Sequence, residues 1–279
     1  MKIESKLPNV GTSIFATMSQ MARDYSAINL SQGFPDFNCD KELIDLVHKY
    51  QIEGQNQYAP MPGIPKLREI ISQKIFKLYG ERYNPDTEIT ITAGATQALF
   101  TAILASVGVG DEVIVFEPAY DSYIPAIIMA GGVPIPIELK GDDFYFDWDE
   151  VKQKISSRTK MIIINSPHNP SGSIITEQDI KILEEIISNR DILILSDEVY
   201  EHIIFDNHKH CSVALYKNLI SKSILVFSFG KTYHTTGWKM GYVLAPENLT
   251  KEFRKVHQFN VFSVNTPIQY AYSDYMNIE

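Results

Sequence analysis

The chain has 279 residues, enough for one large domain or two small ones. Hydrophobic residues make up 44% and charged residues 21%, as in an ordinary globular protein. The net charge of −9 disfavours nucleic acids and anionic membrane surfaces as partners. The two cysteines, Cys39 and Cys211, lie far apart and match no metal-ligand spacing, so we expect a reduced, cytoplasmic protein without a metal site. The start of the chain lacks the apolar core of a signal peptide, and we expect no membrane span.

The first part of the chain differs in pattern from the rest. Leu30–Phe37 and Gln57–Pro65 are rich in turn residues and prolines, so neither segment suits a helix interior. A helix is predicted from about Lys66 to Tyr79. We expect residues 1–40 to form an amino-terminal arm belonging to a small domain, and residues 41–279 to form the large domain.

Short apolar runs alternate with helical patterns from residue 88 onward. The predicted strands are 88–91, 112–116, 133–137, 161–165, 192–196, 224–228 and 241–245. The predicted helices are 96–107, 122–130, 176–188 and 247–257. Several strands are apolar at successive residues, as expected when both faces of a sheet are covered. This alternation predicts an α/β fold with a mainly parallel sheet flanked by helices.

Lys231 is the most informative single residue. It lies in Ser228-Phe-Gly-Lys231, directly after a predicted strand, and therefore at the carboxyl edge of the sheet, where ligands of open α/β folds bind. An amine at this place can form a Schiff base with an aldehyde. The alternative interpretation is an exposed surface lysine.

A possible anion site precedes the helix that begins near Thr96. The small residues of Thr92-Ala-Gly-Ala-Thr-Gln97 would let backbone amides approach a phosphate at the helix start. The alternative is an ordinary N-capped helix. The segment is no Walker sequence, because no Gly-Lys-Ser/Thr follows.

Three further strand ends carry polar or aromatic residues. Asn165-Ser-Pro-His-Asn169 would present Asn169 rigidly, and we expect His168 to be solvated or hydrogen-bonded rather than a metal ligand. Asp197 or its neighbour Glu198 would need a cation or a donor if buried, and a protonated pyridine nitrogen or a structural salt bridge would serve. Tyr120, two residues after Pro118, is a candidate for stacking on an aromatic ring.

These motifs, in this order, closely resemble those of the class I aminotransferases, fold type I enzymes that depend on pyridoxal 5′-phosphate (PLP). The resemblance covers essentially the whole chain. The segment Ser228–Lys239 is most similar to the branch of methionine aminotransferases and kynurenine aminotransferase-like enzymes. The resemblance implies transamination between an L-amino acid, with methionine or an aromatic or apolar residue favoured, and a 2-oxo acid.

The resemblance also implies a role for each matching residue. Lys231 would hold PLP and move protons, and Asp197 would pair with the pyridine nitrogen. Tyr200 and Asn169 would hydrogen-bond the ring hydroxyl, and Tyr120 would stack on the ring. The residues implied around the phosphate are Ala95, Thr96, Gln97, Ser228 and Lys239. Many relatives carry arginine where Lys239 stands; lysine keeps the charge but loses the bidentate fork.

A homodimer with shared active sites is a further implication. Tyr58 would reach the phosphate of the neighbouring subunit, and Phe262 would line the neighbour's substrate pocket. Gly33 would offer its backbone near the substrate carboxylate, and Asn169 would help to orient the substrate.

One departure from the family pattern affects the expected activity. The family binds the substrate carboxylate with an arginine from a carboxyl-terminal small domain, which we expect to be absent from this sequence. None of the arginines here matches that position; they are Arg23, Arg68, Arg82, Arg158, Arg190 and Arg254. We therefore expect cofactor binding with poor transamination.

Three other functions are left open by the sequence. A PLP-dependent carbon–sulfur β-lyase would use the same scaffold, and a catalytically impaired PLP-binding member of the family would keep the cofactor alone. A PLP-binding part of a transcription factor would need an amino-terminal helix-turn-helix domain, for which there is no room before Leu30.

Overall fold

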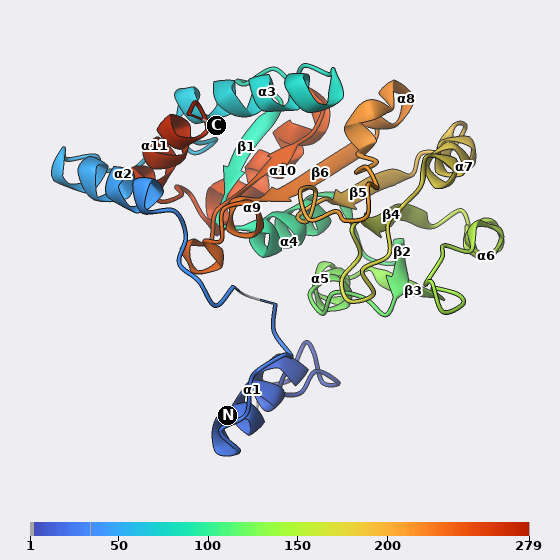
Figure 1. Ribbon diagram of the computed structural model, residues 1–279. Helices are drawn as coiled ribbons and strands as arrows, with labels where there is room; N and C mark the ends of the chain where they lie inside the picture. The colour runs from blue at the N-terminus through green and yellow to red at the C-terminus, as the bar shows by residue number, and fades with distance from the viewer. Residues whose placement is uncertain (1–2, 34, 279) are drawn as a thin grey trace.

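A computed structural model describes residues 3–33 and 35–278 (Figure 1). Seven strands form one sheet in the order β1-β7-β6-β5-β4-β2-β3. Their bounds are β1 Ile89–Thr92, β2 Glu112–Glu117, β3 Val133–Glu138, β4 Thr159–Asn165, β5 Leu193–Asp197, β6 Ser223–Ser228 and β7 Gly241–Leu244. Only β7 runs antiparallel to its neighbours, β1 and β6, within this sheet. The predicted mainly parallel sheet is therefore confirmed.

Helices cover both faces of the sheet. Their bounds are α1 Ile14–Asp24, α2 Lys41–Ile52, α3 Pro65–Tyr79, α4 Ala95–Ser106, α5 Tyr123–Ala130, α6 Trp148–Lys154, α7 Glu177–Ile187, α8 Lys217–Ile220, α9 Phe229–Thr232, α10 Glu247–Asn260 and α11 Thr266–Tyr275, with short 3₁₀ turns at Val213–Leu215 and Thr236–Trp238. One core joins α3, α6, α7 and α11 to one face of the sheet, and a second joins α4, α5 and α10 to the other. Figure 1 shows α3 and α4 on opposite sides of the strands.

Local chemistry explains where the main helices begin and end. α3 starts with Pro65 at a position where no N–H is needed, and Gly80 ends it in the left-handed region at φ 75°. α7 starts with a capping box, in which the Thr176 side chain and the Asp179 side chain each bond the other's backbone N–H. α4 differs, because its first residue follows Gly94 and no side chain caps it.

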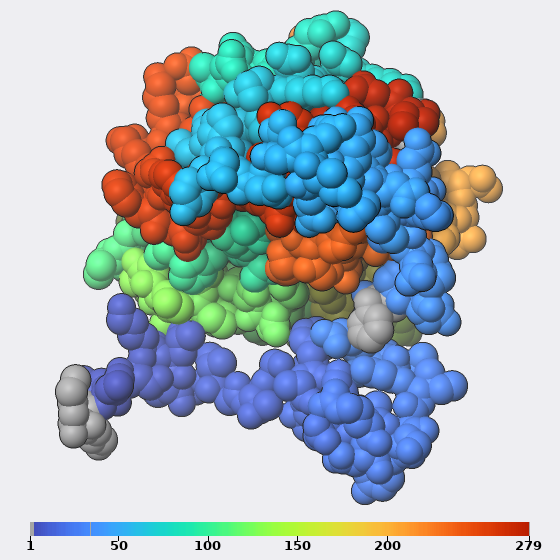
Figure 2. All heavy atoms as spheres, turned by 90° about the vertical axis from the view of Figure 1, so that its left-hand side faces the viewer, coloured from blue at the N-terminus to red at the C-terminus, as the bar shows by residue number. Residues whose placement is uncertain are grey.

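Several helices were not among those predicted from the sequence. α1, α2 and α6 are three of them, and each begins after a capping Ser or Asp whose side chain accepts a backbone N–H. α1 contains no buried residue, and the amino-terminal segment lies as a separate layer beneath the body in Figure 2. None of the helices in the described residues is long and apolar enough to cross a membrane.

Candidate active site

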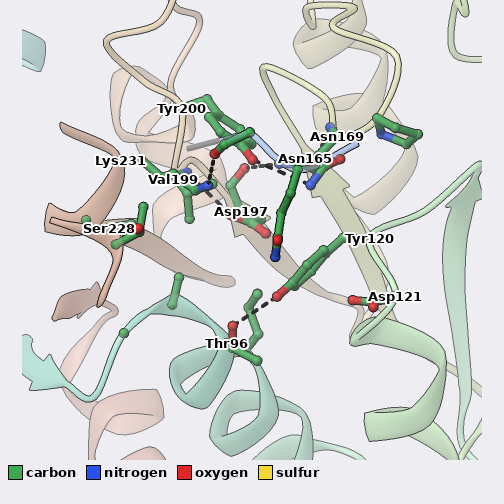
Figure 3. Close-up of a pocket in the computed structure, with 18 of the residues that line it drawn as sticks. Thr96, Tyr120, Asp121, Asn165, Asn169, Asp197, Val199, Tyr200, Ser228 and Lys231 are labelled. Carbon is green, nitrogen blue, oxygen red and sulfur yellow. Dashed lines mark hydrogen bonds between the residues drawn. The ribbon is translucent and has the colours of Figure 1, made fainter. Parts of the chain in front are cut away.

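A cavity of about 520 Å³ lies where the carboxyl ends of β4, β5 and β6 meet the start of α4 (Figure 3). Most of the residues expected at the site line it. They are Gly33, Ala95, Thr96, Tyr120, Asn169, Asp197, Tyr200, Ser228, Lys231 and Lys239. The side chains therefore converge as expected from strand ends that share one edge of a sheet.

One end of the cavity is built for an anion. The first intrahelical bond of α4 joins the N–H of Ala98 to the carbonyl of Gly94, so the preceding N–H groups are left for another acceptor. Lys239, in the left-handed region at φ 54°, lies against Gly94. Gly241 allows the close approach, since a Cβ there would lie 2.6 Å from the Phe227 carbonyl and 3.1 Å from the Ala95 nitrogen. Backbone amides and an ammonium at a helix start together favour a phosphate.

Asp197 provides a buried carboxylate at the opposite end. It is only 3% exposed, and the described residues place no cation within salt-bridge distance of it. Burial raises the pKa of Asp197 to about 6, although the Tyr123 hydroxyl, which donates to Oδ2 at 2.6 Å, and the Val199 N–H oppose the rise. A buried carboxylate without a cation partner would be stabilised in its charged form by a positively charged group in the cavity.

Lys231 lies between these two ends. Its Nζ is 3.5 Å from the Gly33 carbonyl and 5.4 Å from the centre of the Tyr200 ring. Burial and, to a smaller extent, the Lys239 charge lower the pKa of Lys231, while Asp197 acts in the opposite direction. A lowered pKa increases the fraction of neutral, nucleophilic amine near neutral pH.

Aromatic and amide side chains form the remaining wall. The Asn169 amide donates to the Tyr200 hydroxyl at 3.5 Å, and the hydroxyls of Tyr120 and Thr96 lie 3.0 Å apart. Asn165 fixes this region, because its side chain bonds both the Asp197 carbonyl at 2.9 Å and the Asn169 N–H at 2.7 Å.

Three expected site residues lie elsewhere in the chain. The Gln97 side chain accepts from the Ala93 N–H and donates to Thr101 and His257, so it does not line the cavity. Tyr58 is 80% exposed and packs edge-on against the half-exposed Phe262, with ring centres 5.2 Å apart. Neither aromatic residue lines the cavity.

The structure also separates Asp197 from Glu198, which the sequence left as competitors. Glu198 points away from the cavity and pairs with His210 at 2.7 Å. His168 is buried and lies 2.8 Å from the Ser171 hydroxyl, so the expectation of a hydrogen-bonded histidine is confirmed and that of a solvated one is wrong. Burial lowers the pKa of His168 to about 4.

Sequence reasoning missed several residues at the site. Phe15 of α1 lines the cavity although it lies 18 residues before Gly33, the nearest expected site residue, and no local pattern marks it. Tyr123 follows Tyr120 by one helical turn, a spacing that could have suggested a second aromatic at the same place. Asn165, the last residue of β4, lies within one of the motifs, but no role was predicted for it from the sequence.

With this geometry in place, the chain can be compared with known proteins. Residues 25–277 match the family of class I and II aminotransferases, and the chain belongs to that family. It is 49% identical over 276 residues to the methionine aminotransferase of Escherichia coli, which covers 99% of this chain and 72% of that protein. It is 33% identical to rat kynurenine–oxoglutarate transaminase 1, over 95% of this chain and 66% of that protein.

Solved structures of aminotransferases are similar to this chain as well. The structure of E. coli YbdL, described as having a methionine aminotransferase function, superposes with a TM-score of 0.97 at 47% identity and covers all of this chain and 73% of that one. N-succinyldiaminopimelate aminotransferase from Mycobacterium tuberculosis gives a TM-score of 0.95 at 34% identity, over 99% of this chain and 72% of that one. The resemblance to class I aminotransferases and the fold type I architecture are therefore confirmed.

The cofactor of this family is PLP, and the cavity fits it. A phosphate would meet the N–H groups at the start of α4 and Lys239, and a pyridinium would meet the unpaired Asp197 carboxylate. An aldehyde would lie within reach of Lys231 between them. The three chemical demands of the cofactor are thus met by groups that have few other partners within the described residues.

Proposed function

We propose that this protein transfers an amino group from an L-amino acid to a 2-oxo acid, with PLP as cofactor. The observation that carries the proposal is the convergence of Lys231 and Asp197, from the ends of β6 and β5, on a cavity that also contains an anion-binding helix start. Bound PLP supplies an electron sink that acidifies the Cα proton of the amino acid.

The chain's own residues would then perform three tasks. Asp197 would supply the negative charge that keeps the ring nitrogen protonated. Lys231 would hold the cofactor and carry the Cα proton through its Nζ as general base and then general acid. Tyr200 and Asn169 would hold the ring hydroxyl, and Tyr120 would offer its ring for stacking.

The substrate class that the lining favours is apolar or aromatic. Phe15, Leu99 and Met240 contribute apolar surface beside Tyr120. The similarity to an enzyme named methionine aminotransferase points in the same direction. We therefore propose methionine and aromatic amino acids as preferred donors.

We further propose a cytoplasmic homodimer in which each site is completed by the partner. The exposed edge-on pair of Tyr58 and Phe262 supports this proposal, because two large aromatic side chains in solvent are typical of a contact surface. Sedimentation equilibrium of the wild type and of a Tyr58→Ser variant tests it; a wild-type monomer at micromolar concentration would refute the dimer.

The experiment that tests the main proposal is a visible spectrum of the PLP-loaded protein before and after methionine is added. We expect absorbance of the lysine-bound cofactor that is lost on addition of the amino acid, and borohydride treatment should leave a pyridoxyl adduct on the peptide containing Lys231. An unmodified peptide from cofactor-saturated protein would refute the proposal.

Measurements of reaction products and of turnover separate the alternative functions. Pyruvate and ammonia released from cystathionine without a keto-acid acceptor would favour a β-lyase. The described residues that line the cavity include no arginine, which keeps the impaired enzyme as a second candidate. A spectral response to methionine with turnover far below that of the E. coli relative would favour that candidate.

A further inference from the structure

The turn after β5 has two chemically distinct sides. Asp197 and Tyr200 line the cavity, whereas Glu198 and Glu201 point away from it with side chains only 2% and 1% exposed. The Glu201 N–H donates to the Glu198 carbonyl at 3.0 Å and closes the turn. Because inward and outward residues alternate along one short stretch of backbone, a displacement of the glutamates displaces the cavity residues as well.

Glu198 is held from several directions. One of its carboxylate oxygens accepts from the Ser196 hydroxyl at 2.9 Å and from the Val213 N–H at 3.1 Å. The other lies 2.7 Å from His210 Nε2. His210 and Val213 belong to the segment before α8, so this contact ties the turn to a part of the chain outside the cavity.

Glu201 is tied to a different element. It accepts from Lys74 Nζ at 2.5 Å and from the Tyr79 hydroxyl at 2.6 Å, and both donors belong to α3. Lys74 also donates to the Tyr242 hydroxyl on β7 at 3.1 Å. α3 packs on the face of the sheet opposite to α4, so these donors do not line the cavity.

Each of the two buried glutamates faces a basic side chain. Burial would lower the pKa of His210, but the contact with Glu198 outweighs it and raises that pKa. Burial alone would raise the pKa of Glu201, yet Lys74 and His202 lower it to about 2. Breaking either pair would leave an uncompensated buried charge, which is strongly unfavourable. The two pairs therefore resist movement of the turn.

We propose that Glu198 and Glu201, held by His210 and Lys74, are positioning residues that fix Asp197 and Tyr200 against the cofactor. This inference rests on the proposed function and adds to it a set of residues that touch neither cofactor nor substrate. It explains why two buried glutamates and two partly buried basic side chains lie behind a turn of five residues when apolar side chains could fill the same space.

The test compares two isosteric substitutions of buried carboxylates. Glu198→Gln weakens the pair behind the turn. Glu112→Gln is the matched control, because Glu112 is also buried and accepts from Ser156 at 2.5 Å and Arg158 Nε at 3.0 Å, but starts β2 at the end of the sheet remote from the cavity. His210→Leu and His210→Gln form a second comparison, since glutamine keeps a neutral donor.

Three quantities are measured for each protein: the Kd for PLP, the pH midpoint of the absorbance of the bound cofactor, and kcat/KM. We expect Glu198→Gln and His210→Leu to weaken PLP binding and lower kcat/KM by about 10- to 100-fold, the range expected from a displacement of about 1 Å. The absorbance midpoint should move with them, and His210→Gln should recover part of each loss. Glu112→Gln should lower only the melting temperature.

Two results would overturn the inference: wild-type Kd and absorbance in Glu198→Gln and His210→Leu, or equal changes in Glu112→Gln. If His210→Leu does not fold, the comparison of Glu198→Gln with Glu112→Gln decides alone. A wild-type protein that fails to bind PLP would instead remove the proposed function, and the two failures are thereby distinguished.

Discussion

Asp197 and Glu198 are adjacent in the chain and almost equally buried, at 3% and 2% exposure, but their surroundings differ. Glu198 has a hydroxyl, a backbone N–H and an imidazole around it. Asp197 has one hydroxyl and one long backbone contact, and its pKa is raised to about 6. The side of the turn that carries Glu198 thus has its hydrogen-bonding capacity filled, and we call it the saturated side. The side that carries Asp197 has few partners, and we call it the ligand side. The difference indicates which side is built for stability and which for a ligand.

The largest expected effect is on the ligand side. Lys231→Ala should lower transamination by at least ~10²–10⁴-fold, because a positioned general acid and base is lost. The melting temperature should change little, since among the described residues the Nζ of Lys231 makes a long contact with the Gly33 carbonyl and lies 5.4 Å from the centre of the Tyr200 ring. Steady-state kinetics and a thermal melt check both expectations.

Lys255→Ala is the control for this substitution, because Lys255 is 70% exposed and pairs only with the nearby Glu252. Near-normal turnover in Lys231→Ala would contradict the assignment and make the lysine a surface residue after all.

On the saturated side a substitution should lower the stability of the fold as well as disturb the cavity residues. Lys74→Met should lower the free energy of unfolding by about 3–5 kcal/mol, because Glu201 is left buried without its cation. Urea denaturation measures the change. The double variant Lys74→Met/Glu201→Gln should recover part of the loss, since no charge is then left unpaired. A single variant as stable as wild type would show that the saturated side does not stabilise the fold.

More of the fold than of the candidate site could be predicted from the sequence. Most strands were recognisable because their apolar residues are buried on both faces, and the motifs were recognisable because they follow those strands. β5 ends at Asp197, one residue later than predicted, so the carboxylate belongs to the strand itself. α1 was missed because none of its residues is buried.

Contacts between distant segments could not be predicted in the same way. Nothing local connects Lys74 with Glu201 or His210 with Glu198, because these pairs form only when α3 and the segment before α8 pack on the sheet. Phe15 reaches the cavity through the course of the amino-terminal segment rather than through a motif. The choice between Asp197 and Glu198 likewise required knowing which side of the turn faces the cavity.

Asp197→Asn should have opposite effects on stability and function. The pKa of Asp197 is raised above its unfolded value, so the folded cofactor-free protein binds the proton more tightly, and stability is lost as pH rises from about 4 to about 6. Removing the charge should stabilise that protein by up to about 3 kcal/mol at pH 8 and by nothing at pH 3. PLP binding and turnover should be impaired at pH 8, where wild-type Asp197 carries its charge.

Denaturation of the cofactor-free protein at the two pH values measures this difference. Asp111→Asn, a carboxylate at the opposite end of the sheet that accepts from the Gly108 N–H at 2.8 Å, is the control and should not stabilise. Equal stability of wild type and Asp197→Asn at pH 8 would mean that Asp197 is compensated within the chain, and the contrast between the two sides of the turn would be lost.

The smallest predicted effect concerns Tyr123, whose hydroxyl is the one side-chain donor to Asp197 among the described residues. Tyr123→Phe removes that donor from a charged acceptor, which should raise the pKa of Asp197 by about one further unit, or about 1.4 kcal/mol. The pH dependence of PLP binding should move to higher pH by the same amount. Tyr120→Phe is the matched control, because its hydroxyl meets Thr96 rather than a carboxylate. An equal shift in both variants would show that loss of any hydroxyl at the cavity has this effect. A shift confined to Tyr123→Phe would show that the Tyr123 hydroxyl, the strong donor on the ligand side, keeps Asp197 ionised in the cofactor-free protein.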